Sequence, residues 1–248
     1  MKFQDRVTIK VIAFTLISLF AIPYYFLAGG TLLGFILIRL VSMFFGFCSQ
    51  IGWHRWLTHN SFQPTKLGRY LMYFGMLSTG IGRPIELVVA HRFHHVNPDT
   101  EQDPHSPKYI SFFRMWLGRY KGISKPVPPR DILRNNEVMW FNNHYWLLFW
   151  IVNFTLCLID FKSALIFIPV SVAYSWFIVT LVNYYGHKNP TGEIASRNTG
   201  PVLAFITGGE GLHKNHHDHP TSSNLGTNNE FDIGYWIVKR FLRAQLST

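Results

Sequence analysis

Cysteine is nearly absent from this chain of 248 residues, which contains only Cys48 and Cys157. Two isolated cysteines, each inside an apolar run, offer neither a disulfide framework nor a Cys-x-x-Cys metal site. Acidic residues are also scarce, since 13 Asp and Glu stand against 23 Lys and Arg and leave a formal net charge of +10. Any metal ion bound by this chain must therefore be held by nitrogen and oxygen atoms.

Several catalytic and binding motifs are missing as well. The sequence has no Gly-x-Ser-x-Gly nucleophile elbow, no His-Glu-x-x-His zinc motif and no glycine loop for phosphates. No nucleic-acid motif accompanies the positive charge, while 48% of the residues are apolar and 17% are aromatic. This composition is rich for a soluble protein and favours contact with a lipid bilayer over contact with nucleic acid.

Long apolar runs predict a membrane protein. Four runs have the length or pairing of transmembrane helices, at residues 9–28, 32–51, 145–161 and 164–185. Basic residues precede the first run, which places the N-terminus in the cytoplasm, and no clean cleavage site follows that would make the run a signal peptide. We predict an all-α integral membrane protein with four transmembrane helices in two hairpins. A cytosolic helical cap of residues 52–144 and 186–248 would complete a single domain over residues 1–248.

Two charged features have more than one interpretation. Arg39 lies within the second run, where a cation is costly and indicates function, although its side chain could equally extend to an interface. The segment between the hairpins carries seven basic residues: Lys108, Arg114, Arg119, Lys121, Lys125, Arg130 and Arg134. They indicate either the positive bias of cytoplasmic loops or a docking site for a phosphate-bearing substrate or an acidic electron donor.

Histidine provides the strongest pattern in the sequence. The spacing His-x-x-His-His occurs twice among twelve histidines, first at His91, His94 and His95 and again at His213, His216 and His217. Residues three and four apart share one face of a helix, so each group directs three imidazoles to one place. Histidines clustered in this way indicate a metal site.

Two further pairs join these groups. His54 and His59 are five residues apart, a spacing that separates the rings around a straight α-helix. We therefore expect the helix to end near residues 58–61, so that His59 turns back towards His54. Asn183 and His187 share a helical face at the end of the last apolar run. Since the second and last runs both return to the cytoplasm, all the histidine groups are predicted to meet at one membrane face.

The remaining segments give weaker predictions. Residues 67–90 are apolar but interrupted by glycines and Pro84, so we expect a broken helical segment, on or partly within the membrane, that leads into His91. Residues 232–246 are expected to form a closing amphipathic helix. Five carboxylates lie near the histidine groups and could orient the rings: Glu86, Asp99, Asp103, Glu210 and Asp218. Three histidines are expected not to bind metal: His105, His144 and His219.

Imidazole ligands suit zinc, copper, nickel and iron, so the ligand type alone does not identify the metal. Eight or nine histidines exceed one tetrahedral site and imply two metal ions. The carboxylate-bridged di-iron pattern of helix bundles needs paired Glu-x-x-His motifs, and only Glu210 with His213 fits. The interpretation that remains is a two-metal site at a membrane surface with mostly histidine ligands.

The three histidine groups resemble the three histidine boxes of the membrane fatty-acyl desaturases: HRWLTH at 54–59, HRFHH at 91–95 and HKNHH at 213–217. Their flanks at 52–62, 103–107 and 209–213 resemble the stearoyl-CoA, or delta-9 acyl-CoA, desaturase branch. The similarity extends from about Leu32 to the C-terminal helix. It implies four membrane helices beneath a cytosolic cap that holds two irons.

The resemblance assigns ten positions to the metal ligands: His54, His59, His91, His94, His95, Asn183, His187, His213, His216 and His217. Asn183 matches an asparagine that reaches one metal through a water molecule. Two departures from the family pattern concern the substrate. Lys214 stands where an asparagine is usual, and Leu87 stands where the animal enzymes carry a substrate-facing tryptophan.

The implied reaction uses O2 to remove two hydrogens from adjacent methylenes of a saturated acyl chain, leaving a cis double bond. We expect the delta-9 position and an acyl-CoA or acyl-lipid substrate, held in a bent apolar tunnel. The second and fourth spans and residues 67–90 are the expected walls of that tunnel. The alternatives are a di-iron hydroxylase of acyl chains or lipids and, more distantly, a zinc-binding membrane transporter, whose ligands would lie nearer the bilayer midplane.

Electrons are expected from a separate donor of the cytochrome b5, ferredoxin or rubredoxin type, since no cytochrome b5-like segment is fused to the chain. The short ends and the lack of an address for the endoplasmic reticulum favour the bacterial inner membrane, with the active site on its cytoplasmic face.

Overall fold

The computed structural model describes residues 3–123, 129–188, 196–227 and 229–243. Helices dominate these residues, and the only β-pairing among them is an isolated antiparallel bridge between Pro64 and Arg243. The prediction of an all-α protein is therefore confirmed. The elements are α1 Phe3–Leu27, α2 Leu32–Gln50, the π-helix η1 Ile51–Thr58, α3 Lys66–Thr79, α4 Pro84–Val96, α5 Phe112–Trp116, α6 Arg130–Leu133, α7 Asn136–Ile159, α8 Phe161–His187, α9 Pro201–Ile206, α10 His213–Asp218, α11 Ile233–Ile237 and the π-helix η2 Val238–Leu242.

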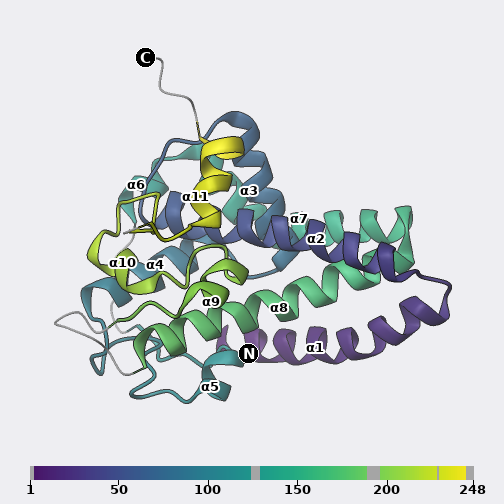
Figure 1. Ribbon diagram of the computed structural model, residues 1–248, viewed down its shortest axis with the longest axis horizontal. Coiled ribbons are helices and arrows are strands. Elements are labelled where there is room, and N and C mark those ends of the chain that lie inside the picture. The colour runs from purple at the N-terminus through teal and green to yellow at the C-terminus, as the bar shows by residue number, and fades with distance from the viewer. Residues whose placement is uncertain (1–2, 124–128, 189–195, 228, 244–248) are drawn as a thin grey trace.

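The long helices and the short helices occupy opposite ends of the molecule. Helices α1, α2, α7 and α8 extend together to one side, while the shorter elements, including α4, α10 and α11, gather at the other end (Figure 1). Helix α1 packs along α8, and α2 packs along both α3 and α8. The ends of α2 and α8 are thereby held next to the short helices that carry the histidine groups.

Three helices in the described part of the chain are long and apolar enough to cross a bilayer. They are Val7–Leu27, Leu32–Thr58 and Phe161–His187, which include three of the four predicted spans. Helix α7 is not among them, because its first turns carry polar residues such as Asn142, Asn143 and His144. It joins α8 through the single residue Asp160, whose side chain accepts a hydrogen bond of 3.2 Å from the backbone N–H of Ser163.

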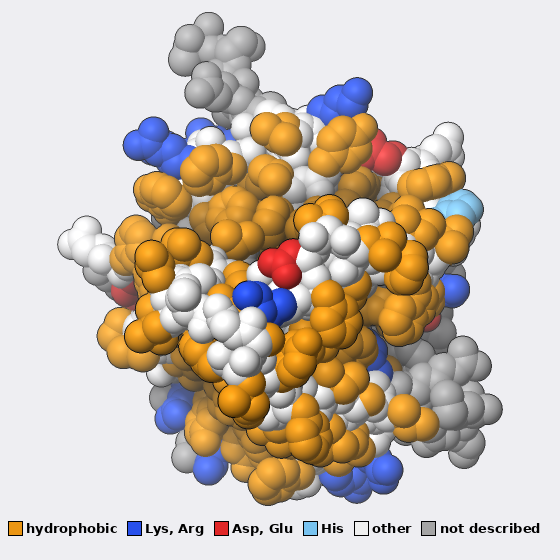
Figure 2. Space-filling view, turned by 90° about the vertical axis from the view of Figure 1, so that its right-hand side faces the viewer, with side chains coloured by type: hydrophobic (Ala, Val, Ile, Leu, Met, Phe, Trp, Pro, Cys, Tyr) orange, Lys and Arg blue, Asp and Glu red, His pale blue; other side chains and the backbone are white. Residues whose placement is uncertain are grey.

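The long helices present an apolar surface. On α2, Leu33, Ile36, Leu37 and Leu40 are all exposed, and similar residues face outward from α1 and α7. Figure 2 shows the molecule from the end where the helical hairpins turn, and apolar side chains cover most of that face. So large an apolar surface is a liability in water and is suited to lipid.

The segment at residues 67–90 forms two helices with one break between them. Helix α3 ends at Gly80, which has a positive φ of 54°, and α4 begins at Pro84, a favourable first residue for a helix. The expectation that Gly75 interrupts the helix is wrong. A Cβ atom at Gly75 would lie 2.5 Å from the carbonyl oxygen of Phe45, so the glycine instead permits α3 to approach α2 closely.

Two predicted segments, the closing helix and the basic segment, extend partly beyond the residues that the structure describes. The closing helix extends from Ile233 to Leu242 and changes from α-helix to π-helix at Val238, and residues 244–248 lie outside the described part. Lys125, one of the seven basic residues, also lies outside it.

The guanidinium of Arg39 lies 5.9 Å from the ring centre of Tyr174 on α8, an arrangement that suits a cation within an apolar bundle.

Candidate metal centre

The first histidine pair is positioned by a π-helix. Residues Ile51–Thr58 continue α2 with hydrogen bonds to the fifth residue along, and the backbone N–H of His59 bonds the carbonyl oxygen of His54 at 3.2 Å. One turn of such a helix therefore spans the five-residue spacing, and the two ring centres lie 5.0 Å apart. The prediction that the helix ends between His54 and His59 is confirmed, but the widened turn, not a reversal of the chain, aligns the rings.

The other groups come from three elements that meet this π-helix. Helix α4 carries His91, His94 and His95 on adjacent positions of one face. The short helix α10 carries the three histidines of the last group, and His187 is the final residue of α8. Residues far apart in the sequence thus meet where a membrane helix joins the short helices.

Five histidines form one group, which we call the five-histidine cluster: His54, His59, His91, His95 and His216. One nitrogen from each ring lies within 4.8 Å of those of the others. The Nε2 atom of His216 is 3.0 Å from that of His54 and 2.9 Å from that of His95. The Nε2 atoms of His95 and His91 are 3.1 Å apart.

Four more histidines form the adjacent group, the four-histidine cluster: His94, His187, His213 and His217. The Nε2 atom of His213 is 2.9 Å from that of His187 and 3.2 Å from that of His217. His217 in turn lies 3.3 Å from His94 between the same atoms. The two clusters touch, because the rings of His95 and His217 stack with centres 4.4 Å apart.

The spacing of these nitrogens fits bound metal ions. A ligand nitrogen lies about 2.0–2.1 Å from a metal such as zinc, so neighbouring ligands of one ion are about 3 Å apart. A neutral imidazole carries one N–H, and in His54, His94 and His187 the Nδ1 atom faces a carboxylate. The Nε2 lone pairs of these rings are therefore free to converge on a cation.

Six of the clustered rings, His91, His94, His95, His213, His216 and His217, have lowered pKa values and are neutral at physiological pH. Burial, followed by the charges of neighbouring imidazoles, holds the pKa of His91, His94, His213 and His216 well below the ordinary value. The same causes lower the pKa of His95 to about 3 and that of His217 to about 2. Only a neutral imidazole binds a metal ion, so these six rings are already in their ligating form.

Three of the five carboxylates singled out in the sequence contact the rings. Glu210 accepts a hydrogen bond from His54, Asp103 accepts one of 2.8 Å from Nδ1 of His94, and Asp99 accepts one of 3.1 Å from Nδ1 of His187. The other two have different surroundings. Glu86 lines the large cavity described below, and Asp218 pairs with Lys214 at 2.6 Å.

Arg55 is the main residue that sequence reasoning missed. Its side chain is 1% exposed and uses all five N–H groups. Nε donates to Glu210 at 3.0 Å, the two Nη atoms donate to Asp232 at 2.7 and 3.2 Å, and they also bond the carbonyl oxygens of Ser223 and Gly208. Its position next to His54 was the available signal, but no sequence spacing links it to Asp232.

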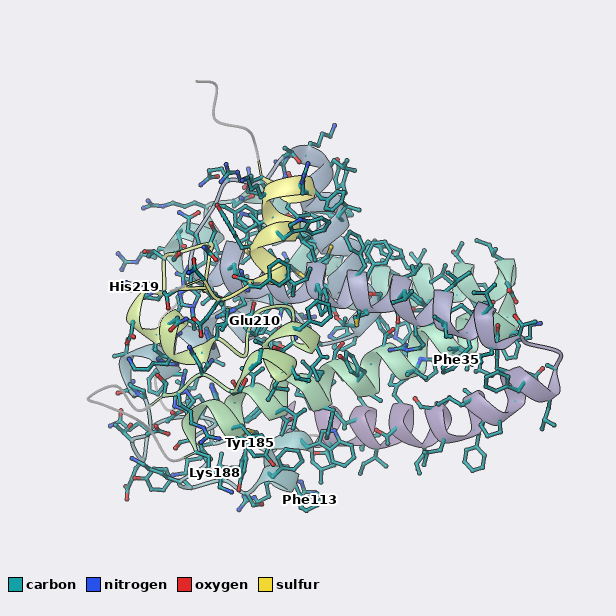
Figure 3. All side chains as sticks on the ribbon, in the orientation of Figure 1. Phe35, Phe113, Tyr185, Lys188, Glu210 and His219 are labelled. Atoms are coloured by element: carbon teal, nitrogen blue, oxygen red, sulfur yellow. The ribbon has the colours of Figure 1, made fainter. Side chains whose placement is uncertain are left out.

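The three histidines left aside in the sequence lie in different surroundings. His105 is buried beside the four-histidine cluster, with its ring centre 4.3 Å from that of His94 and its Nδ1 3.9 Å from Asp103. His144 bonds the carbonyl oxygen of Trp140 on α7 at 2.8 Å. Figure 3 shows His219 at the outer edge of the short-helix end, whereas Glu210 lies in its interior.

Asn183 faces a small cavity of about 20 Å³ next to both clusters. Its lining includes His54, His91, His213 and Glu210. That volume suffices for about one water molecule. The side chain lies one helical turn before His187, as the sequence spacing indicates.

A larger cavity of about 230 Å³ adjoins the same place. At one side it meets His91, His105 and Asn183, and it extends to Ile81 and Trp176. Its remaining lining is mostly apolar and comes from η1, α4, α8, the loop at 104–105 and the segment at 118–123: Trp53, Leu87, Ala90, Pro104, Gly118, Tyr120, Gly122, Ile123 and Val179, with Glu86 and Lys121 as charged members. An apolar chain could therefore lie against the histidine clusters.

Comparison with known proteins gives a consistent result. A family model described as fatty acid desaturase matches residues 30–224. The chain is 25% identical over 231 residues to the delta-9 desaturase-like 4 protein of Arabidopsis thaliana, covering 88% of this chain and 75% of that protein. It is 29% identical over 224 residues to an acyl-CoA 5-desaturase of Anemone leveillei, with coverage of 82% and 66%. It is 28% identical over 239 residues to delta-9 acyl-lipid desaturase 2 of Arabidopsis thaliana, with coverage of 91% and 76%.

Proposed function

Because this chain belongs to the fatty acid desaturase family, we propose that it is an O2-dependent di-iron enzyme that introduces a cis double bond into a saturated acyl chain. The observation that carries the proposal is the pair of touching histidine clusters beside an apolar cavity. Two irons, when bound, would activate O2, which is reduced to two water molecules by two electrons from the external donor and the two hydrogens removed from the acyl chain, with two protons from solvent. An unactivated methylene has no acidic proton, so acid–base residues alone cannot perform this reaction.

The donor set supports iron over zinc. Zinc in proteins prefers four ligands, whereas the five-histidine cluster offers five nitrogens within 4.8 Å of one another, and neighbours among His54, His91, His95 and His216 are 2.9–3.1 Å apart. We propose that these five histidines hold one iron. The four-histidine cluster holds the other, with Asn183 contributing through a water molecule in the small cavity that it lines.

The residues of the large cavity act by positioning. Trp53, Leu87, Ile81 and Trp176 form apolar parts of its wall. A saturated chain bound there would exclude water and hold one pair of methylenes against the metal centre, which contributes to rate through proximity. Of the expected walls, the fourth span and residues 67–90 contribute lining residues, whereas the second span at 32–51 contributes none and Trp53 lies just beyond its end.

We propose the delta-9 position and an acyl-CoA substrate. The relatives named for delta-9 activity support the position, and an acyl-CoA relative supports the carrier, with acyl-lipid as the alternative carrier. Lys121 lines the cavity and belongs to the basic segment, which suits a phosphate-bearing head group.

We also propose that α7 forms a fourth span and that the histidine end lies on the cytoplasmic face. Exposed Leu147, Trp150, Phe154 and Leu158 on α7 and its one-residue connection to α8 support the hairpin. The basic segment supports the cytoplasmic orientation, and a bacterial inner membrane remains our choice of membrane. A separate electron donor of the cytochrome b5, ferredoxin or rubredoxin type would dock on this side.

Expression in a host that lacks its own desaturase tests the proposal. Double bonds in the host's fatty acids would be located by mass spectrometry, with an electron donor supplied. We expect a new monoenoic acid with a cis delta-9 bond from the wild-type chain, none from His216→Ala, and an unchanged product from His219→Ala. A hydroxylated product would show that the enzyme is a hydroxylase and not a desaturase. Purified protein that carries zinc and gives no new product would favour a metal transporter.

A further inference from the structure

The two histidine clusters differ in the charges that surround them. In the four-histidine cluster, two of the four rings are hydrogen-bonded to carboxylates, His94 to Asp103 and His187 to Asp99. Both aspartates are buried, and their other hydrogen-bond donors are neutral. Asp103 accepts the backbone N–H groups of Asp99 and His105, and Asp99 accepts the hydroxyl of Ser106. Among the described residues, no lysine or arginine forms an ion pair with either aspartate.

In the five-histidine cluster, the ring of His54 has a carboxylate partner, Glu210, and that carboxylate shares the cation of Arg55 with Asp232. These three groups together carry one negative charge, against two for Asp99 and Asp103. Glu210 accepts a hydrogen bond from His54 and another of 3.0 Å from Arg55, and Arg55 is buried. Arg92 adds positive charge near this cluster, since it donates to the carbonyl oxygens of Thr58 and Leu57, next to His59. Its partner Asp131 is about half exposed, so this second contribution is weakened by solvent.

These differences affect the two oxidation states of iron unequally. A ferric ion carries one more positive charge than a ferrous ion, and a buried uncompensated carboxylate therefore stabilises it more. A carboxylate on the outer nitrogen also makes an imidazole a stronger electron donor to the metal. The fifth imidazole of the larger cluster is neutral and does not offset the charge of two aspartates.

We propose that the iron held by the four-histidine cluster has the lower reduction potential of the two, so that it is oxidised first and reduced last. The inference rests on the di-iron centre proposed above. It assigns Asp99 and Asp103 the role of positioning residues that separate the two potentials. Arg55 has the opposite role, because it offsets one of the two negative charges of Glu210 and Asp232 and so keeps the potential of the five-histidine iron above that of the other.

A redox titration of purified full-length protein loaded with ⁵⁷Fe in detergent tests the inference, with the oxidation state of each iron followed by Mössbauer spectroscopy. We expect two one-electron midpoints in the wild-type protein. Asp99→Asn and Asp103→Asn keep the shape of the side chain and should each raise the lower midpoint alone. A change of about tenfold in the preference for ferric iron corresponds to about 59 mV.

Two further variants complete the design. Glu210→Gln should raise the upper midpoint alone, because it removes the carboxylate of the other cluster. Asp218→Asn is the matched control, since Asp218 follows His217 directly in sequence but pairs with Lys214 and should move neither midpoint.

A single shared midpoint in the wild-type protein, or a rise of the upper midpoint in the Asp99 and Asp103 variants, would overturn the inference while leaving the di-iron proposal intact. A protein that takes up no iron would overturn both. Iron content, measured on the same samples, separates these two results without reference to enzyme activity.

Discussion

Single residues in this protein support the site from a distance, and Arg55 is the clearest example. It connects the first histidine group to Glu210 and to Asp232, which lies 177 residues further along the chain. A fully buried guanidinium costs a large desolvation energy, which its five hydrogen bonds offset. Glycines make room for it, because a Cβ atom at Gly234 would lie 2.7 Å from its Nη2 atom.

Replacing Arg55 with methionine should therefore unfold the short-helix end. The change leaves Glu210 and Asp232 buried without their cation, and the expected loss of stability is about 3–5 kcal/mol. Thermal unfolding in detergent would measure it. Arg69→Met is the control, because Arg69 pairs with the exposed Glu137 and such a pair contributes about 0–1 kcal/mol. Equal effects of the two substitutions would contradict this interpretation of Arg55.

Gly186 provides a second prediction at this scale. A Cβ atom there would lie 2.5 Å from Cδ2 of His213, so Gly186→Ala should displace that ring and empty the four-histidine cluster. We expect iron content to fall from about two ions per chain to about one. Gly46→Ala on α2 is the matched control, since a Cβ atom there meets nothing within 4 Å, and retention of two irons in both variants would refute the prediction.

At the scale of elements, helix α4 both carries ligands and shapes the cavity. Its last turns hold His91, His94 and His95, while Leu87, one turn earlier, forms part of the cavity wall. One rigid helix thus fixes the distance between the metal centre and the acyl chain. The size of the side chain at position 87 should accordingly influence which chains fit.

Leu87→Trp should shift the products towards shorter acyl chains, because the indole fills part of a cavity of about 230 Å³. The product profile for saturated substrates of increasing length, determined by gas chromatography, would reveal the shift. Leu87→Ile preserves the side-chain volume and should leave the profile nearly unchanged. An unaltered profile for the tryptophan variant would show that the chain lies elsewhere.

The sequence predicted these elements with unequal success. Apolar length located α1, α2 and α8, and the three- and four-residue spacings of His91, His94 and His95 correctly indicated a shared helical face. The π-helix at Ile51–Thr58 was not predictable, because a widened turn leaves no distinct apolar period in eight residues. The role of Gly75 was also missed, since a glycine that permits close packing looks in sequence like one that breaks a helix.

At the scale of the whole molecule, many neutral imidazoles are concentrated in one buried region. Their pKa values are lowered in the folded protein, while in the unfolded chain they return to about 6.5. The unfolded state therefore binds more protons as the pH falls below about 6.5. Acid must then favour unfolding, down to the folded pKa values of about 3 and 2 for His95 and His217.

We expect the metal-free protein to lose stability steadily between pH 6.5 and pH 4. The free energy of unfolding should fall by about 1.4 kcal/mol per pH unit for each histidine that is neutral in the folded protein and protonated in the unfolded chain. Thermal unfolding in detergent, recorded across this range, would measure the slope. The variant His144→Ala should keep the same slope, because His144 lies outside both clusters. A melting temperature that does not change between pH 7 and pH 5 would contradict the charge state assigned to the clusters.

The assembly of the centre from distant segments has a consequence for biosynthesis. Its histidines extend from position 54 to position 217, and the carboxylate that completes the surroundings of Arg55 is at position 232. A ribosome adds about 5–20 residues per second, so the earliest ligand waits on the order of ten seconds for the last one. During that interval the α1–α2 hairpin can enter the bilayer while His54 and His59, which follow it, remain without partners. Metal ions can therefore fill both clusters only after almost the entire chain has been translated.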